Sequence, residues 1–178
     1  MEPDTCPRCR DRSHLVSHGR AIGDYDGPLR AIIHALKYAG HRSLARPLAG
    51  LMIVSGARVL HDADLVVPVP LHRARKRARG FNQAAEIARH LTTPTVDALK
   101  RTRATMSQTD HPAEARQANV RDAFALRRRV DVKERVVVVV DDVSTTGATL
   151  EACARVLLDA GAREVRALTA ARVVSRPR

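Results

Sequence analysis

The chain has few aromatic residues and few cysteines. Its 178 residues include no tryptophan, two tyrosines, two phenylalanines and three cysteines. Proteins that bind single-stranded nucleic acid without sequence preference stack the bases on aromatic side chains, and such platforms are poorly supplied here. An odd number of cysteines gives no complete disulfide framework and favours a reducing compartment. The composition therefore argues against a disulfide-stabilised secreted module.

Long apolar segments are lacking as well. The five valines at 136–140 are too few to cross a bilayer. The first residues, from Met1 to Cys6, have neither the basic start nor the apolar core of a secretory signal. We therefore expect a cytoplasmic protein with no membrane partner.

Positive charge is in excess, with a formal net charge of +12 at pH 7. The proportions of 28% charged and 44% hydrophobic residues are those of a globular chain, and the length suffices for one buried core. A net positive charge of this size favours polyanionic partners such as phosphates, pyrophosphate or nucleic acid, although it does not determine the fold.

Residues 1–20 differ from residues 21–178, because they carry cysteine and histidine without apolar periodicity. Cys6 and Cys9 enclose Pro-Arg, and two thiolates at this spacing can chelate one zinc ion from a tight turn. His14 and His18 would complete a four-ligand set. The alternative is a tail with two solvated histidines, because half-motifs of this kind are common.

Patterns of helix and strand alternate over the remaining chain. Helices are expected to begin at Gly27 and at Ser43, to cover 81–91, and to follow residue 149 as far as Gly161. Strands are expected over 64–71, 95–99, 121–126, 136–140 and 163–174. This order predicts an α/β fold with a doubly wound parallel sheet. The helix from Ser43 is expected to bury Leu44, Leu48, Leu51, Met52 and Val59.

The valine strand runs directly into a polar junction. Asp141 and Asp142 end the expected strand, and small and hydroxyl residues follow before a helix begins. Backbone N–H groups at a helix start, helped by the helix dipole and by hydroxyl donors, bind phosphate. Two acids would repel a bare phosphate, so the ligand should also offer hydroxyls or a divalent cation, as a ribose 5-phosphate does. The alternative is an ordinary polar turn between a strand and a helix.

A second polar segment follows the strand expected at 64–71. Pro68 and Pro70 cannot donate hydrogen bonds to a neighbouring strand, so pairing should end there. Five cations lie within 73–79. Such a run is usually a solvated face, but open α/β sheets bind ligands at the carboxyl ends of their strands.

The segment 137–149, VVVVDDVSTTGAT, resembles the motif with which type I phosphoribosyltransferases bind phosphoribosyl pyrophosphate (PRPP). A wider set of short motifs, over about 25–172, is similar to ComF-type competence-associated phosphoribosyltransferase-like proteins. The set comprises Leu36-Lys37-Tyr38 with Gly40, residues 67–71 and 79–83, Arg101 with Gln108, Arg116 with Asn119, and Ala123-Phe124.

The resemblance implies roles for the matching residues. Asp141 and Asp142 would hold the ribose hydroxyls and act with Arg101 in catalysis, with a lid over 101–121. The 5-phosphate would lie on Ser144, Thr145, Thr146, Gly147, Ala148 and Thr149. The pyrophosphate would lie on Pro70, Leu71, Arg73 and Arg79. Mg²⁺ is implied as a cofactor, whereas Zn²⁺ is in question, because the family usually has two Cys-x-x-Cys pairs near its N-terminus and only Cys6 and Cys9 match here.

The resemblance also implies an activity, the transfer of the phosphoribosyl group of PRPP to an unidentified acceptor with release of pyrophosphate. The alternative is a non-catalytic protein of DNA uptake that binds PRPP or another nucleotide and contacts single-stranded DNA or a helicase partner. The shortage of aromatic residues counts against strong strand binding. The acids and the lid-like segment together favour catalysis.

Overall fold

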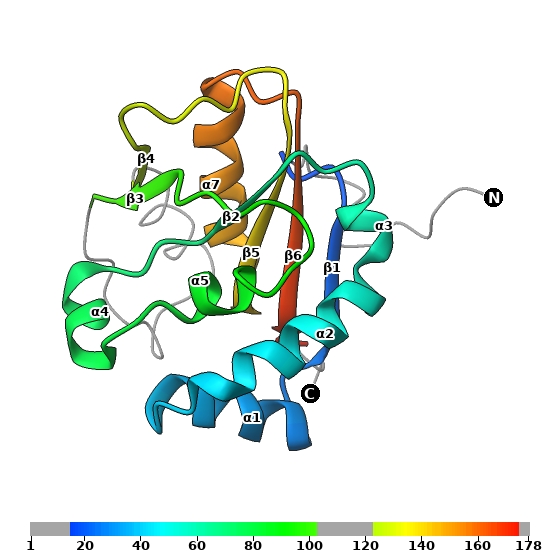
Figure 1. The fold of residues 1–178 in the computed structure, drawn as a ribbon, viewed down its shortest axis with the longest axis vertical. Coiled ribbons are helices and arrows are strands. Elements are labelled where there is room, and N and C mark those ends of the chain that lie inside the picture. Colours follow the sequence, from blue (N-terminus) through cyan, green and yellow to red (C-terminus); the bar gives the residue numbers. More distant parts are fainter. Residues whose placement is uncertain (1–14, 103–122, 175–178) are drawn as a thin grey trace.

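A computed structural model describes residues 15–102 and 123–174 (Figure 1). The strands are β1 (Gly19–Asp24), β2 (Leu65–Pro68), β3 (Leu99–Arg101), β4 (Phe124–Leu126), β5 (Val136–Ser144) and β6 (Glu164–Arg172). The helices are α1 (Gly27–Tyr38), the 3₁₀ turn η2 (Arg42–Leu44), α2 (Ala45–Ser55), α3 (Ala57–Leu60), α4 (Arg73–Arg79), α5 (Gln83–Ala88) and α7 (Ala148–Asp159).

Four of the strands form one parallel sheet in the order β1-β6-β5-β2. The central pair is the longest, with Val140 of β5 opposite Leu168 of β6 and Pro68 of β2 on the other side. A separate antiparallel pair joins β3 and β4. The expected α/β fold with a parallel sheet is confirmed.

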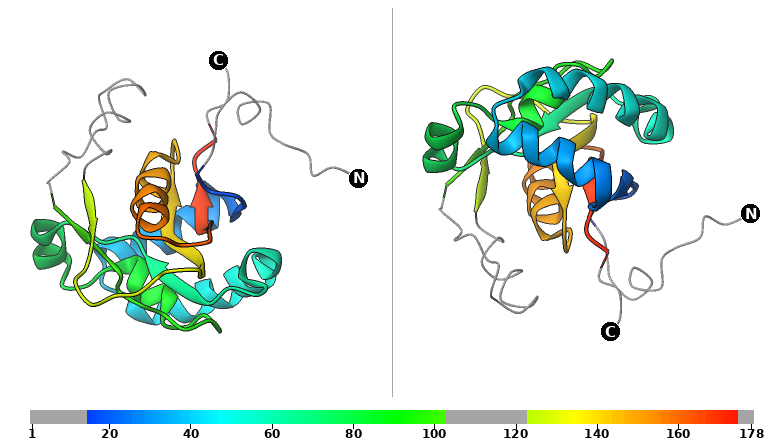
Figure 2. Two further views of the ribbon diagram at one scale, coloured as in Figure 1. Left: turned by 90° about the horizontal axis from the view of Figure 1, so that it is seen from above. Right: turned by 90° about the horizontal axis from the view of Figure 1, so that it is seen from below.

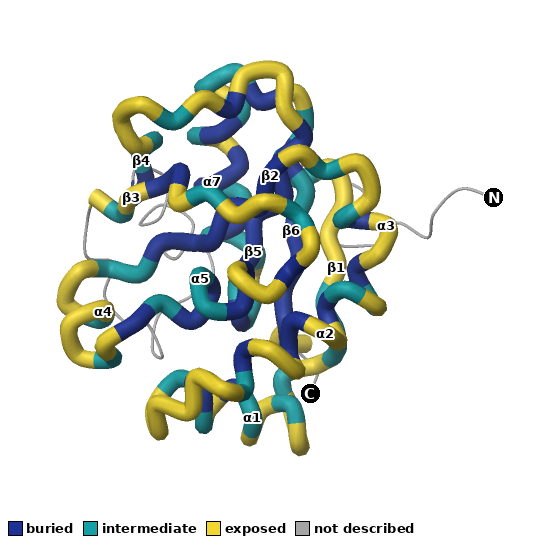
Figure 3. The backbone as a smooth tube through the Cα atoms, in the orientation of Figure 1, coloured by how far each residue is buried: buried dark blue, intermediate teal, exposed yellow. Residues whose placement is uncertain are grey.

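Each face of the sheet has its own apolar core, because side chains alternate along β5. Val137 and Val139 pack with Cys153 and Leu157 of α7. Val138 and Val140 pack on the other face, in a core built from α1, α2 and α5. Figures 1 and 2 show α7 on one side of the sheet and α1 and α2 on the other. All five valines are buried, as are all four residues of β2 (Figure 3).

The sequence analysis missed two elements. Strand β1 pairs in parallel with β6 at the edge of the sheet, and it begins at Gly19, before the boundary drawn after residue 20. The basic stretch 73–79, for which no helix was predicted, forms the helix α4. His72 caps α4 by accepting a hydrogen bond from the N–H of Ala74 at 3.3 Å, and Gly80 ends it with a φ of 79°.

The second expected helix is wrong in three respects. Ser43 lies inside η2, so it does not cap a helix, and the side chain of Leu51 is 50% exposed. Gly56 separates α2 from α3, where a Cβ atom would lie 2.6 Å from Leu168. The strand expected at 95–99 is β3, which begins only at Leu99.

Within residues 15–102 and 123–174, no helix is both long and apolar enough to span a bilayer.

Candidate functional site

The candidate site lies where β2 and β5 end side by side. The N–H of Val69 donates to the carbonyl of Val140 at 2.9 Å, so the turn at Pro70 lies beside the acids that follow Val140. After β2 the chain continues through α4 into α5, which packs on one face of the sheet, and after β5 it continues into α7 on the other face. Open α/β sheets bind ligands at such a change of side, outside the carboxyl ends of the strands.

Strand β5 is longer than expected. It does not stop at residue 140 but includes both acids and ends at Ser144. Only Thr145, Thr146 and Gly147 lie between it and α7. Pairing with β6 extends to the same point, with Asp141 opposite Thr169. The acids are therefore held by the sheet.

The two acids face opposite sides, as the two-residue period of a strand requires. The Asp142 carboxylate lies on the α1 side, where its Oδ1 is 2.9 Å from Nζ of Lys37. Asp141 lies on the α7 side, where Arg101 and Cys153 are its electrostatic neighbours. Lys37 of α1 thus pairs with Asp142 and also acts electrostatically on Asp141, on which Arg101 of β3 acts less strongly.

Asp141 is held in an environment that disfavours its charge. Burial, followed by the neighbouring carboxylate of Asp142, raises the pKa of Asp141 to about 7. Three groups lower the pKa of Asp141. The backbone N–H of Asp142 donates to Oδ1 of Asp141 at 2.8 Å, and the cations Lys37 and Arg101 favour the charged carboxylate. Burial likewise lowers the pKa of Arg101 and raises that of the Cys153 thiol. The guanidinium of Arg101 also lies 5.4 Å from the centre of the Phe124 ring.

The expected 5-phosphate segment forms the junction between β5 and α7. Thr145 and Thr146 are exposed, and Ser144, Gly147, Ala148 and Thr149 are half-buried. Gly147 precedes the helix with a φ of 79°, and the hydroxyl of Thr146 accepts from the N–H of Ala148 at 3.4 Å. The first N–H groups of α7 have no carbonyl of their own helix to bond. Together with the hydroxyls, they make a donor-rich rim.

The residues expected at the pyrophosphate are only partly brought together. Pro70 is buried and Leu71 half-buried in the turn beside the acids. Arg79, at the end of α4, donates to Oε1 of Gln83 at 3.2 Å and to the hydroxyl of Tyr38 at 3.4 Å. Arg73 is exposed at the other end of α4. The turn is fixed from α5, since Nδ2 of Asn82 donates to the carbonyl of Val69 at 2.9 Å.

The sequence analysis missed Lys37 and Gln83 as site residues. Gln83 is 1% exposed, and its Nε2 has no hydrogen-bond partner among the described residues. Lys37 and Gln83 both belong to the short motifs that carried the resemblance, yet spacing alone did not place Lys37 beside Asp142.

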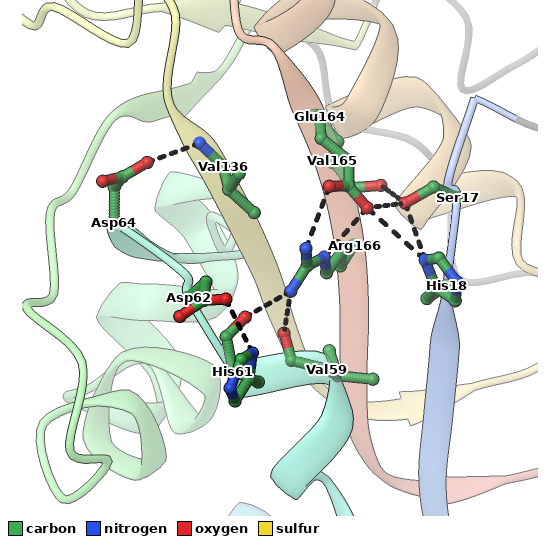
Figure 4. Close-up of polar contacts among 10 residues, drawn as sticks. All are labelled: Ser17, His18, Val59, His61, Asp62, Asp64, Val136, Glu164, Val165 and Arg166. Atoms are coloured by element: carbon green, nitrogen blue, oxygen red, sulfur yellow. Dashed lines mark hydrogen bonds and ion pairs between the residues drawn. The ribbon is translucent and has the colours of Figure 1, made fainter.

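The proposed zinc ligands can be followed only at His18, because Cys6, Cys9 and His14 lie outside the described residues. His18 is exposed, and its Nδ1 lies 3.4 Å from Oε1 of Glu164 and 3.2 Å from the hydroxyl of Ser17 (Figure 4). Across residues 15–102 and 123–174, no three His, Cys, Asp or Glu side chains group as metal ligands would. Of the expected lid over 101–121, only Arg101 and Thr102 are described.

Glu164 belongs to a polar cluster (Figure 4). Because Glu164 pairs with Val136 at the start of β5, the cluster lies at the amino end of the sheet, away from the acids. Arg166 donates to both carboxylate oxygens of Glu164 at 2.9 Å and to the backbone carbonyls of Val59 and His61. This cluster ties β6 to the end of α3 and, through Ser17, to the start of β1.

Comparison with protein-family models matches residues 77–177 to the phosphoribosyl transferase domain. The chain is 34% identical over 173 residues to DNA utilization protein YhgH of Escherichia coli, covering 90% of this chain and 74% of that protein. It is 33% identical over 171 residues to competence protein F of Haemophilus influenzae, covering 90% and 75%. It is 27% identical over 155 residues to competence protein ComFC of Bacillus subtilis, covering 86% and 63%.

Solved structures similar to the chain include the allosteric regulatory enzyme of purine biosynthesis, at 28% identity and a TM-score of 0.44. That match covers 70% of this chain but only 25% of the enzyme. A hypoxanthine-guanine phosphoribosyltransferase of Bacillus anthracis has 14% identity and a TM-score of 0.44, with 72% of this chain and 68% of the enzyme covered.

Proposed function

The chain belongs to the phosphoribosyl transferase domain family, among its ComF-type members, and we propose that it binds PRPP and transfers the phosphoribosyl group to an acceptor, releasing pyrophosphate. One observation carries this proposal. The acids, the donor-rich rim before α7 and the turn at Pro70 all lie at the neighbouring carboxyl ends of β5 and β2. A ribose that carries a 5-phosphate and a pyrophosphate needs three such groups side by side.

The ligand would be held by complementary chemistry at each part. Carboxylates accept hydrogen bonds from ribose hydroxyls, which fits Asp141 and Asp142. The N–H groups and hydroxyls from Ser144 to Thr149 donate to phosphate oxygens. The turn at Pro70 and Leu71, with Arg79 and Arg73 of α4, would take the pyrophosphate.

In the reaction, the bond between the anomeric carbon and the pyrophosphate oxygen breaks, and a bond from the acceptor to that carbon forms. The pyrophosphate leaves with the bonding electron pair. Arginines beside the leaving group stabilise its charge, and fixed carboxylates beside the ribose stabilise the positive sugar. Arg101, half-buried next to Asp141, is suited to this electrostatic role.

Mg²⁺ is the cofactor that this chemistry implies. Carboxylates such as those of Asp141 and Asp142 are oxygen donors of the kind that Mg²⁺ prefers, and one of them would suffice together with pyrophosphate oxygens and water. When bound, the ion would neutralise charge on the leaving pyrophosphate.

A second candidate function is binding without catalysis, in DNA uptake or use. The names of the relatives, a DNA utilization protein and competence proteins, support it. So does α4, which displays exposed cations on the same side as the site. In this function PRPP or another nucleotide would be a bound effector, and single-stranded DNA or a helicase would be the partner.

Calorimetric titration of PRPP with Mg²⁺ into the protein tests the proposal, with Asp141→Asn/Asp142→Asn as the comparison variant. This variant keeps the basic surface and loses the ribose contacts. Saturable binding that the variant lacks supports the site, and pyrophosphate release with candidate acceptors then separates catalysis from binding alone. Equal binding by both proteins, or binding by neither, would refute the proposed site.

A further inference from the structure

The ion pair between Lys37 and Asp142 has no role in the function proposed above. Its Nζ and Oδ1 atoms lie 2.9 Å apart, and the two side chains are only 16% and 11% exposed. Two charges withdrawn from water to this degree depend on each other, because removal of one leaves the other uncompensated. The pair is therefore a fixed part of the site and not a surface contact.

Lys37 is held in place by its neighbours in the last turn of α1. Leu36 is fully buried in the core between α1 and the sheet. On the other side, the ring of Tyr38 lies 4.9 Å from the guanidinium of Arg79, whose Nη2 donates to the Tyr38 hydroxyl. The end of α1 is thus attached to the sheet through Leu36 and to α4 through Tyr38. These contacts fix the backbone from which the Lys37 side chain reaches Asp142.

This pair changes the charge balance at the carboxyl end of β5. The sequence alone indicated two acids whose repulsion of a phosphate would have to be offset by the ligand or by a divalent cation. In the structure Asp142 pairs with Lys37, and Lys37 and then Arg101 act electrostatically on Asp141. The chain itself thus supplies two cations for its two acids.

We propose that Lys37 supplies at Asp142 the positive charge that a divalent cation would otherwise provide, so that this carboxylate accepts a ribose hydroxyl with no metal ion bound to it. Lys37 is then a positioning residue, which occupies Oδ1 and leaves Oδ2 for the ligand. The inference rests on the proposed function, and it leaves Mg²⁺ free to accompany the pyrophosphate of PRPP.

Ribose 5-phosphate is the most direct ligand for this test. It has the ribose hydroxyls and the 5-phosphate, but it has no pyrophosphate that could bind Mg²⁺. Its affinity is measured by calorimetry in EDTA and in Mg²⁺. The proteins are the wild type, Lys37→Met, Lys37→Arg and Arg30→Met. Arg30 is exposed on the same helix, so Arg30→Met is a control for the loss of one charge.

The wild type, Lys37→Arg and Arg30→Met are expected to bind with affinities that Mg²⁺ changes by less than about twofold. Lys37→Met is expected to bind about tenfold more weakly in EDTA and to recover most of this loss in Mg²⁺. Mg²⁺ titrated alone should give a binding signal with Lys37→Met that the wild type lacks.

The inference is overturned if the wild type binds ribose 5-phosphate only with Mg²⁺, or if folded Lys37→Met binds as the wild type does in EDTA. If PRPP with Mg²⁺ also fails to bind the wild type, the proposed function fails as well, and the two failures are thus distinguishable. If Lys37→Met does not fold, Lys37→Met/Asp142→Asn removes the uncompensated carboxylate. That variant is expected to bind weakly with or without Mg²⁺, and a Mg²⁺ response from it would refute the inference.

Discussion

Asp141 and Asp142 are consecutive residues of β5, and their carboxylates face opposite sides of the sheet. Asp142 pairs with Lys37 of α1 at 2.9 Å, whereas Asp141 lies beside Arg101 of β3 and Cys153 of α7. The two acids are therefore not equivalent. Substitution of each should have its own effect on stability, even if both contact the same ribose.

Asp141→Asn is expected to stabilise the protein at pH 8 and to have little effect below pH 4. The pKa of Asp141 is raised from 3.8 to about 7 in the folded state, so the stability that its protonated form contributes is lost as pH rises between these values. The melting temperature of the variant in EDTA should exceed that of the wild type by about 5 °C at pH 8. Asp159→Asn, at an exposed acid of α7, is the control. If the melting temperature of Asp141→Asn differed from that of the wild type by the same amount at every pH, a raised pKa of Asp141 would be contradicted.

Glu164→Gln is expected to destabilise the protein at neutral pH by about 2 kcal/mol, since it removes a charged partner of Arg166. The pKa of Glu164 is lowered from 4.5 to about 2 by hydrogen bonds from Arg166 and then Ser17. The free energy of unfolding of the wild type should therefore exceed that of Glu164→Gln by the full amount above pH 4.5. This difference should disappear as pH falls toward 2. Urea unfolding from pH 2 to 7 measures it, with the exposed Glu134→Gln as the control. If the wild type were still more stable than Glu164→Gln at pH 2, the ionised carboxylate of Glu164 would not be the cause of the difference.

Gly147→Ala is expected to lower the free energy of unfolding by about 1 kcal/mol. Gly147 has a φ of 79°, and its Cβ position is open, so the cost is backbone strain without a steric clash. Gly147→Asn should cost less, because asparagine tolerates the left-handed region. Gly19→Ala, at an open site in β1 without a positive φ, is the control. Urea unfolding of the three variants measures the difference, and an unchanged Gly147→Ala would rule out strain at this junction.

Lys76→Gln/Arg77→Gln tests the second candidate function, because both residues are exposed on α4. If single-stranded DNA binds this face through both residues, the variant should bind more weakly, and the magnitude of the slope of log affinity against log salt should fall by about 1.4. Arg58→Gln/Arg155→Gln removes two exposed cations elsewhere and serves as the matched control. Equal slopes for the two variants would exclude α4 as the contact surface. PRPP binding should be unchanged in both.

The centre of the fold could be predicted because its pattern allows few alternatives. Val136 to Val140 are apolar on both faces, which suits only a strand covered on both sides, and the structure confirms it. The end of this strand could not be predicted, because aspartate has a low propensity for strands and two aspartates, Asp141 and Asp142, follow the valines. Pairing with β6 overrides that preference.

The missed elements share another cause. Strand β1 has only exposed and half-buried residues, with no clear apolar alternation, so its pairing with β6 defines it more than its own sequence does. For α4 the sequence contained a usable signal, because Gly80 has the left-handed conformation that often ends a helix. The charge run indicates a solvated face or a ligand-binding segment, so no helix was predicted there. The position of Lys37 beside Asp142 depends on how α1 crosses the sheet, which no local pattern encodes.

The position of β6 between β1 and β5 has a consequence for synthesis on the ribosome. Asp24 and Arg172 are partners in register, yet they are 148 residues apart in the chain. Strand β1 is therefore made long before the strand that it pairs with. The two segments of the sheet can join only when β6 has left the exit tunnel, so we expect β1 to stay unpaired until β6 has been synthesised.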